Sequence, residues 1–319
     1  MYESMGQLSL WEDRSSLVKY LANKLKDNSL SLVLGAGVSN AFGLPGWAEL
    51  ITTIEHRIPF KCNSDDVYEK GNELRDYFEE HGGYSLYLDA VQAALYKEIK
   101  DDFEELNDRK ILDAIAALCI PSRRGSVKDI ITFNFDNILE IYLRYYGIVS
   151  YSPVSGNSWR TNSDVNIFHI HGFLPKDRRE TRSESIVFDG KSYKERVDYS
   201  NWEWAPQISS LLRCTTSIYI GLSGNDDNME RFVRDSEVHH AYKKTSDLFW
   251  GITFIRDKGT QDANHEETMR KIIDKWKAWK IFPIIIKNKD DDSAACGRDE
   301  FEAQIKSFLY AISQEAACL

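Results

Sequence analysis

Short apolar runs alternate along this chain with segments whose apolar residues recur at helical spacing. Continuous apolar runs are typical of parallel strands that are covered on both faces. The runs predict strands at residues 30–34, 129–133, 165–171, 186–188, 217–222, 249–255 and 282–287. Helical spacing predicts helices at residues 15–28, 47–58, 138–145, 204–212, 269–276 and 299–314.

This alternation predicts an α/β fold with a doubly wound parallel sheet of the Rossmann-like kind. Residues 59–121 depart from it because they are rich in charge and helix formers and contain no convincing strand. We expect them to form a mostly helical insertion, since a simple βαβ unit needs only roughly 30 residues. The expected organisation is a single domain over residues 1–319.

Composition narrows the class of protein. The chain has 319 residues, of which 42% are hydrophobic and 28% charged, as in globular proteins rather than disordered or membrane ones. No apolar run approaches the roughly 18 residues of a spanning helix, and the first residues lack the features of a signal peptide. We therefore expect a cytoplasmic protein with no membrane partner.

Charge and cysteine content exclude further classes. A net charge of −10 argues against direct nucleic-acid binding, which depends on clustered Lys and Arg. The five cysteines are scattered, without any C-x-x-C pair, so neither a disulfide framework nor a four-cysteine zinc site is expected. An anionic cofactor stays compatible, because backbone amides and helix dipoles hold phosphates without net positive charge.

The first predicted strand breaks into a glycine-rich turn, Gly35-Ala-Gly-Val-Ser39. Gly35 and Gly37 have no Cβ, so a pyrophosphate could approach this backbone, and the next N–H groups could point at it. The dinucleotide fingerprint G-x-G-x-x-G fails, because Asn40 stands at its third glycine. The acid about 20 residues on, Glu55, lies in a predicted helix rather than at the end of a strand, which weakens a dehydrogenase interpretation.

Polar clusters follow other predicted strands as well. They are Thr132-Phe-Asn-Phe-Asp136, His169-Ile-His-Gly172 and Gly221-Leu-Ser-Gly-Asn-Asp226. Because the carboxyl ends of parallel strands share one edge of the sheet, we expect these clusters to converge there with the glycine turn.

Taken in order, the clusters resemble the sirtuin superfamily. They match its G-A-G-x-S followed by G-[IL]-P, its T-x-N-x-D, its H-G and its G-x-S, over roughly residues 30–228. The resemblance implies a sirtuin-type NAD⁺ site at which the bond between nicotinamide and ribose is broken, so that NAD⁺ is a substrate.

The resemblance also implies roles for individual residues. It places the pyrophosphate and adjacent ribose at Gly35, Ala36, Gly37 and Ser39, the adenosine half at Gly221 and Ser223, the nicotinamide ribose near Asn134 and Asp136, and the general base at His171. Asp226 counts among the cofactor-binding candidates and is equally compatible with a loop.

Three departures from the sirtuin pattern bear on activity. The region after Gly172 lacks the four-cysteine zinc module of deacylating sirtuins, Pro45-Gly46-Trp47 replaces P-D-F-R, and Phe133 stands where T-Q-N has glutamine. They weaken acyl-lysine recognition more than NAD⁺ binding. The chain in this respect is similar to zinc-less sirtuin-like domains of bacterial anti-phage systems, which deplete NAD⁺ in abortive infection. That resemblance implies a homo-oligomer and a partner protein such as a HerA-type ATPase.

Asn134 and His171 have side chains that suit cleavage of the bond between nicotinamide and ribose. Cleaving the bond to a cationic pyridinium develops oxocarbenium character, which needs a fixed ribose and a polar group at the reacting carbon. Asn134 can orient ribose hydroxyls or water without titrating, and the imidazole of His171 is a suitable proton acceptor near neutral pH.

Each candidate also has a structural interpretation. The glycines can serve a tight turn alone, and Asn134 and Asp136 can form an Asx turn and an N-cap for the helix at 138–145. His169 and His171 have the spacing of a metal pair but lack a third ligand, so no metal is expected and His169 is interpreted as a packed or hydrogen-bonded strand residue.

The leading hypothesis is an NAD⁺ glycohydrolase that releases nicotinamide and ADP-ribose. An alternative is a non-catalytic subunit that senses NAD⁺ or ADP-ribose, which the lost glutamine position favours. An NAD-dependent protein deacylase and a hydride-transferring dehydrogenase are weaker alternatives.

Overall fold

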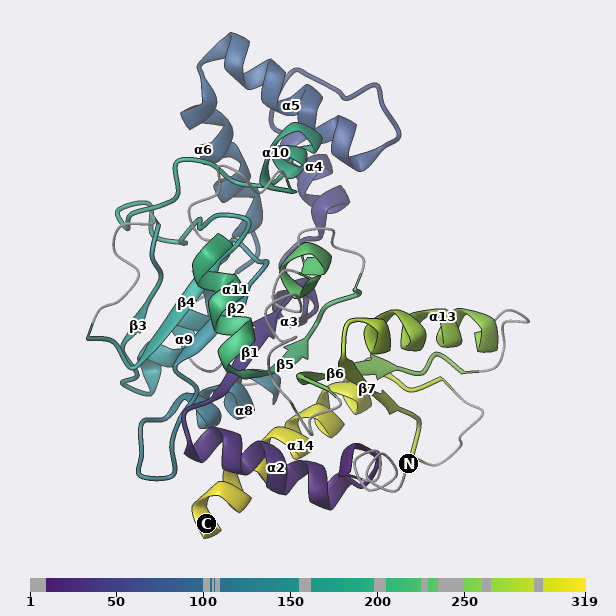
Figure 1. The fold of residues 1–319 in the computed structure, drawn as a ribbon. Helices are drawn as coiled ribbons and strands as arrows, with labels where there is room; N and C mark the ends of the chain where they lie inside the picture. Colours follow the sequence, from purple (N-terminus) through teal and green to yellow (C-terminus); the bar gives the residue numbers. More distant parts are fainter. Residues whose placement is uncertain are drawn as a thin grey trace.

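A parallel sheet of seven strands forms the centre of the molecule, in the order β3-β4-β2-β1-β5-β6-β7 (Figure 1). This computed structural model describes residues 10–99, 104, 106, 110–154, 162–197, 205–224, 229–234, 249–259, 265–289 and 295–319. The strands are β1 Leu30–Leu34, β2 Asp129–Thr132, β3 Ser150–Tyr151, β4 Val165–His169, β5 Thr216–Ile220, β6 Gly251–Arg256 and β7 Ile281–Ile286. All neighbouring strands pair in parallel, so the predicted doubly wound parallel sheet is confirmed.

One of the predicted strands is wrong. Residues 186–188 are buried but form no strand. This segment packs as an apolar loop, in which Phe188 makes edge contacts with the rings of Trp47 and Phe135 at 5.4 and 6.1 Å. A continuous apolar run indicates that a segment is buried, but it does not distinguish a buried strand from a loop that is buried under helices. The two-residue edge strand β3 is too short to leave a periodic signal.

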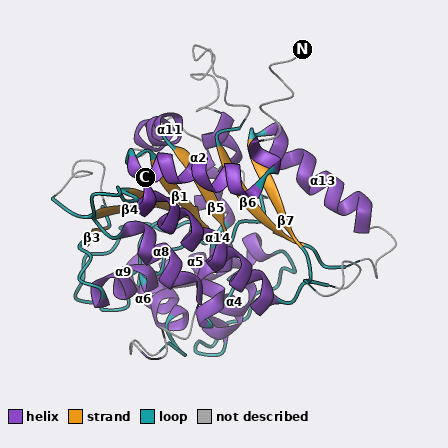
Figure 2. Ribbon diagram, turned by 90° about the horizontal axis from the view of Figure 1, so that it is seen from below, coloured by secondary structure: helices purple, strands orange, loops and turns teal. Residues whose placement is uncertain are grey.

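Helices cover both faces of the sheet (Figure 2). They are α2 Arg14–Lys26, α3 Ala36–Ser39, the 3₁₀ helix η1 Asn40–Phe42, α4 Trp47–Glu55, α5 Val67–His81, α6 Tyr84–Leu95, α8 Lys110–Cys119, α9 Ile138–Tyr145, α10 Gly190–Val197, α11 Ala205–Cys214, α13 His265–Ala278 and α14 Arg298–Cys318. Among the described helices, none is long and apolar enough to cross a membrane.

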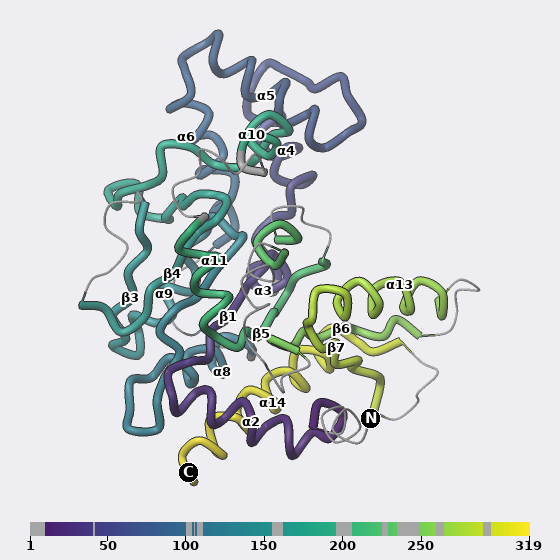
Figure 3. Tube along the Cα trace, viewed as in Figure 1, coloured from purple at the N-terminus to yellow at the C-terminus, as the bar shows by residue number. Residues whose placement is uncertain are grey.

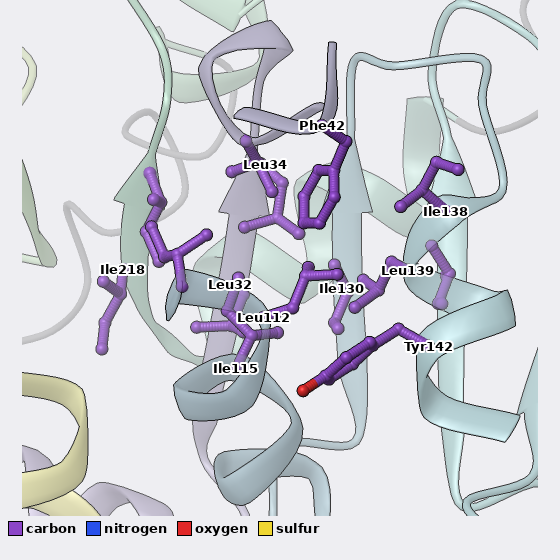
Figure 4. Close-up of a cluster of buried hydrophobic side chains, with 14 of the residues drawn as sticks. Leu32, Leu34, Phe42, Leu112, Ile115, Ile130, Ile138, Leu139, Tyr142 and Ile218 are labelled. Atoms are coloured by element: carbon purple, nitrogen blue, oxygen red, sulfur yellow. The ribbon is translucent and has the colours of Figure 1, made fainter. Parts of the chain in front are cut away.

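The sheet is apolar on both faces because each face packs against its own helices. Alternate strand residues such as Leu32 and Ile130 join the cluster under α2, α8, α9 and α14, where Leu112 and Ile115 of α8 pack onto them (Figure 4). The residues between them, such as Val33, pack with α11 and α13. This two-sided burial explains why β1 is buried along its whole length.

A second group of helices lies beyond the carboxyl ends of the strands. Helices α4, α5, α6 and α10 contact one another at the top of the view in Figure 3. Helix α5 is capped by Asp66, whose carboxylate accepts from the amides of Tyr68 and Glu69 at 2.9 and 3.0 Å. Helix α8, which belongs to the same stretch of sequence as α5 and α6, packs instead against α9 and α14 under the sheet.

The order of the strands places the candidate residues. Strand β1 is flanked by β2 on one side and by β5 on the other, so the chain reverses its winding direction at β1. Ligands of open parallel sheets bind at such a switch point, outside the carboxyl ends of the strands. The glycine turn after β1 therefore occupies the centre of the candidate site.

Candidate functional site

The glycine turn packs directly against the chain that follows β5. A Cβ on Gly37 would lie 2.7 Å from the Cα of Gly221, and a Cβ on Gly35 would lie 2.6 Å from the Gly221 carbonyl oxygen. Gly221 itself has a φ of +73°, in the left-handed region that favours glycine. These glycines are thus required for the close approach of two backbone segments, whatever ligand lies above them.

Most of the backbone amides in this turn already donate hydrogen bonds to carbonyls of the protein. Gly35 donates to the carbonyl of Ile220 at 2.9 Å, Gly37 to that of Gly221 at 2.9 Å, and Val38 to that of Gly35 at 3.0 Å. The amides of Gly37 and Val38 are therefore not open donors, in contrast to the expectation from the sequence.

Asn134 lies in the loop after β2, and its side chain connects this loop to the glycine turn after β1. Its Nδ2 donates to the Gly35 carbonyl at 3.1 Å and to the Ser39 Oγ at 2.7 Å. Its own amide donates to the Oγ1 of Thr132 at 3.1 Å. Because both donors of the carboxamide are used, its orientation is fixed, and Oδ1 accepts no hydrogen bond from the described residues. The half-buried side chain thus offers an acceptor at the carboxyl edge of the sheet.

Asp136 lies deeper in the same loop. Its Oδ1 accepts from the amide of Ile138 at 3.1 Å, which is an Asx turn, whereas the N-cap of α9 is Asn137 and its side chain makes no capping bond. Burial raises the pKa of this carboxyl above its ordinary value, while a hydrogen bond from the Ser39 side chain opposes the shift. Ser39 therefore bridges Asn134 and Asp136, and it is buried rather than exposed to a ligand.

His169, the last residue of β4, forms a buried ion pair with Glu140 of α9. Its Nδ1 contacts the carbonyl of Asn134 at 2.8 Å and its Nε2 contacts the Glu140 Oε1 at 2.7 Å. A carbonyl only accepts, so Nδ1 carries a proton, and a second proton on Nε2 makes the ring an imidazolium facing a carboxylate. This is the hydrogen-bonded strand histidine that the sequence predicts.

The pKa of His169 reflects this pairing. Burial alone lowers it, but the charge and hydrogen bond of Glu140, together with the Asn134 carbonyl, raise the pKa above the ordinary value of histidine. The side chains of His169 and Glu140 are only 2% and 7% exposed, so water screens their attraction little. The pair holds the backbone of Asn134 in place, since His169 bonds its carbonyl.

A small cavity lies among these groups. Its lining includes Ser39, Asn134, Asp136, Glu140 and His169, and about 20 Å³ of it is open to the centre of a water molecule, enough for about one water. The Glu140 Oε2 is buried there and has no hydrogen-bond partner among the described residues. The cavity is too small for a nucleotide and belongs to the support beneath the site.

His171 lies past the end of β4, separated from His169 by a turn. Gly172 donates to the His169 carbonyl at 3.1 Å and has a φ of +96°, so the two histidines do not continue one strand. The ring of His171 is buried beside Phe133 and Tyr193, with ring centroids 5.2 and 6.2 Å away. The structure thus places His171 beside Phe133, the residue that precedes Asn134.

The remaining candidates lie on the β5 side of the turn. Gly221 and Ser223 are exposed after β5, and Ala36 and Gly37 are exposed on α3. Asp226 lies outside the described residues. Within the described part of the chain, no group of three or more His, Cys, Asp or Glu side chains is arranged to hold a metal ion.

Sequence reasoning missed Glu140. Its only local signal is its position in the first turn of α9, where an acid is common because it suits the helix dipole. The contact with His169 spans 29 residues of sequence and depends on how α9 packs beside β4.

Comparison with known proteins gives one family. Residues 128–284, just under half of the chain, match the family model described as SIR2-like domain. A solved structure from work on the mechanism and regulation of Sir2 enzymes is similar to this chain at 12% sequence identity, with a TM-score of 0.41 and coverage of 94% of this chain and 97% of that chain. None of the curated proteins matches this sequence.

Proposed function

We propose that this chain, whose residues 128–284 match the family model described as SIR2-like domain, is an NAD⁺ glycohydrolase. In this reaction the bond between the nicotinamide nitrogen and the ribose C1′ breaks, and its electron pair leaves with neutral nicotinamide. A water oxygen bonds to C1′ and releases one proton, so that NAD⁺ and water give nicotinamide, ADP-ribose and a proton. NAD⁺ is the substrate, and the proposal needs no metal.

The observation that carries the proposal is the fixed carboxamide of Asn134. Its Nδ2 is held by the Gly35 carbonyl and the Ser39 hydroxyl, at 3.1 and 2.7 Å, which leaves Oδ1 as an oriented acceptor. An acceptor of this kind can orient a ribose hydroxyl or the attacking water and favours the developing positive charge at C1′. An oriented dipole needs no reorganisation during the reaction, which is why its rigidity matters.

His171 supplies a proton acceptor in this proposal. It lies beside Phe133 at the carboxyl end of the sheet and is 5% exposed, so its ring is shielded from bulk water. The neutral imidazole would take the proton of the attacking water as the C1′–O bond forms. His169 has a different role, because both of its ring nitrogens already bond to the protein.

A nicotinamide-release assay tests the proposal. We expect purified protein to release nicotinamide from NAD⁺, His171→Asn to reduce kcat by about 100-fold or more, and Asn134→Ala to reduce it comparably. His56→Asn, at the exposed C-cap of α4, and Asn23→Ala, at an exposed position of α2, are matched controls that keep full activity. Equal activity of the site variants and the wild type would overturn the assignment.

A non-catalytic sensor of NAD⁺ or ADP-ribose is the second candidate, favoured by Phe133 in the loop beside Asn134, where the sirtuin pattern has glutamine. Calorimetry with chromatography of the recovered nucleotide separates the two functions. Stoichiometric binding of NAD⁺ that stays intact throughout supports the sensor and contradicts the hydrolase.

The biological setting proposed for the hydrolase rests on the sequence resemblance. We propose that the chain is one domain over residues 1–319, that it acts in the cytoplasm as a homo-oligomer, and that it depletes NAD⁺ in anti-phage defence beside a partner such as a HerA-type ATPase. Light scattering gives the mass of the assembly. Nucleotide extraction from infected cells that carry wild type or Asn134→Ala tests the depletion.

A further inference from the structure

A larger pocket lies beside the glycine turn, on the side away from Asn134. It extends from Gly37 and Gly221 across the ends of β5 and β6 to the first turns of α14. About 220 Å³ of it is open to the centre of a water molecule, against about 20 Å³ for the cavity under Asn134. Its size and its position at the switch point suit a nucleoside rather than a single water.

The walls of this pocket are of two kinds. Side chains of Ile111, Ile220, Phe301 and Ile305 give it an apolar wall that a flat base can contact. Its charged groups are Arg256, Arg298 and Glu302. Arg298 and Glu302 form an ion pair at 3.0 Å, so the lining keeps one positive charge, that of Arg256.

Arg256 is the last residue of β6 and is half-buried. Its backbone belongs to the β6–β7 ladder, but its guanidinium makes no hydrogen bond or ion pair with any described residue. Its neighbour Asp257 is bonded instead to the amide of Gly259 and to the Nε2 of His265, both at 2.9 Å. A partly desolvated cation that has no counterion among the described residues favours an anionic ligand, and a guanidinium suits a phosphate because it can form two parallel hydrogen bonds.

The strand order sets where that anion lies along the nucleotide. Strand β6 is separated from β1 by β5, and neighbouring strands are about 4.8 Å apart, so Arg256 lies about 10 Å along the sheet edge from the glycine turn. A pyrophosphate over the turn lies on the β1 side of the pocket, two strands away from Arg256. A phosphate on the adenosine ribose, one group further along the ligand, would reach it.

We propose that this pocket binds the adenosine half of a dinucleotide that carries a phosphate on its ribose 2′-hydroxyl, with Arg256 as the phosphate ligand. The base contacts the apolar wall, and Arg298 borders the same phosphate from α14. An arginine near the adenosine ribose is a general means of accommodating a 2′-phosphate. The inference rests on the proposed function, because it takes the pyrophosphate to lie over the glycine turn, and it names NADP⁺ as a substrate beside NAD⁺.

Calorimetry with the two product nucleotides tests the pocket without turnover. We expect wild-type full-length chain to bind 2′-phospho-ADP-ribose about tenfold to a hundredfold more tightly than ADP-ribose. Arg256→Met should remove most of this preference, and Arg256→Lys should keep part of it, because a lysine retains the charge but not the paired donors. Arg270→Met, at an exposed position of α13 outside the pocket, is the matched control and should keep the full preference.

The outcomes separate this inference from the proposed function. Equal affinities for the two nucleotides, a preference for ADP-ribose, no binding of either, or a preference that survives in a folded Arg256→Met protein would overturn the pocket assignment. Nicotinamide release from NAD⁺ together with equal affinities leaves the hydrolase standing and removes the 2′-phosphate site. A preference lost in Arg256→Met together with no nicotinamide release from either dinucleotide supports the pocket and removes the hydrolase.

Discussion

Replacing Glu140 by glutamine tests the buried charge pair beneath Asn134. The substitution keeps the shape of the side chain and removes the carboxylate that faces the Nε2 of His169 at 2.7 Å. A glutamine amide can still donate to a neutral imidazole, whose Nδ1–H stays on the Asn134 carbonyl. The variant therefore removes the charge interaction but not every hydrogen bond.

The structure sets the magnitude of the loss. With the two side chains 2% and 7% exposed, the Coulombic attraction is about 4 kcal/mol for charges about 4 Å apart at an effective dielectric constant of 20. Breaking a buried pair by removing one partner costs about 3–5 kcal/mol. Because Asp136 also attracts His169, we expect a loss near the lower end, about 3 kcal/mol, in the free energy of unfolding at pH 6.

The pH dependence gives a second readout with opposite signs in the two proteins. The folded-state pKa of His169 is raised above its ordinary value, so the stability it contributes is fully present below about pH 6.5 and is lost as the pH rises through the folded-state pKa. In Glu140→Gln burial dominates and lowers that pKa, so stability should increase as the pH rises towards neutrality.

Urea unfolding followed by circular dichroism between pH 5.5 and 8.5 measures both effects. Glu79→Gln, which removes an exposed ion pair with Arg75, is the matched control and should change stability by less than about 0.5 kcal/mol. The double variant Glu140→Gln/His169→Asn should show neither pH slope. A Glu140→Gln protein within about 1 kcal/mol of wild type at pH 6, with an unchanged slope, would refute the ion pair.

Two further predictions concern the backbone and a thiol. Gly37→Ala should destabilise the protein by more than about 2 kcal/mol in the same urea assay, because its Cβ would lie 2.7 Å from the backbone after β5; Gly43→Ala, with a φ of +77° but nothing within 4 Å, should cost only about 1 kcal/mol. Similar costs for the two would contradict the close approach. Burial, and then a hydrogen bond to Glu55, raise the pKa of Cys62 to about 12, so iodoacetamide at pH 8 should alkylate Cys62 far more slowly than the exposed Cys318. Glu55→Gln should speed that alkylation, and mass spectrometry of the labelled peptides that finds equal rates for the two thiols would contradict the shift.

The sequence by itself determined much of the framework. Strand β1 and the helix over residues 138–145 were predicted because each depends on the spacing of neighbouring apolar residues, which is a local property. The place of Asn134 and His171 at the carboxyl edge of the sheet also followed from the sequence, since parallel strands bring all such ends together.

Only the tertiary structure decided the partners of the polar groups. The sequence could not show that the turn amides bond to the chain after β5, that His169 faces Glu140, or that Arg256 has no counterion among the described residues. Nor could it tell that the apolar residues 186–188 form a buried loop instead of a strand. These outcomes depend on packing between segments distant in sequence, which decides whether a buried polar group is paired or available to a ligand.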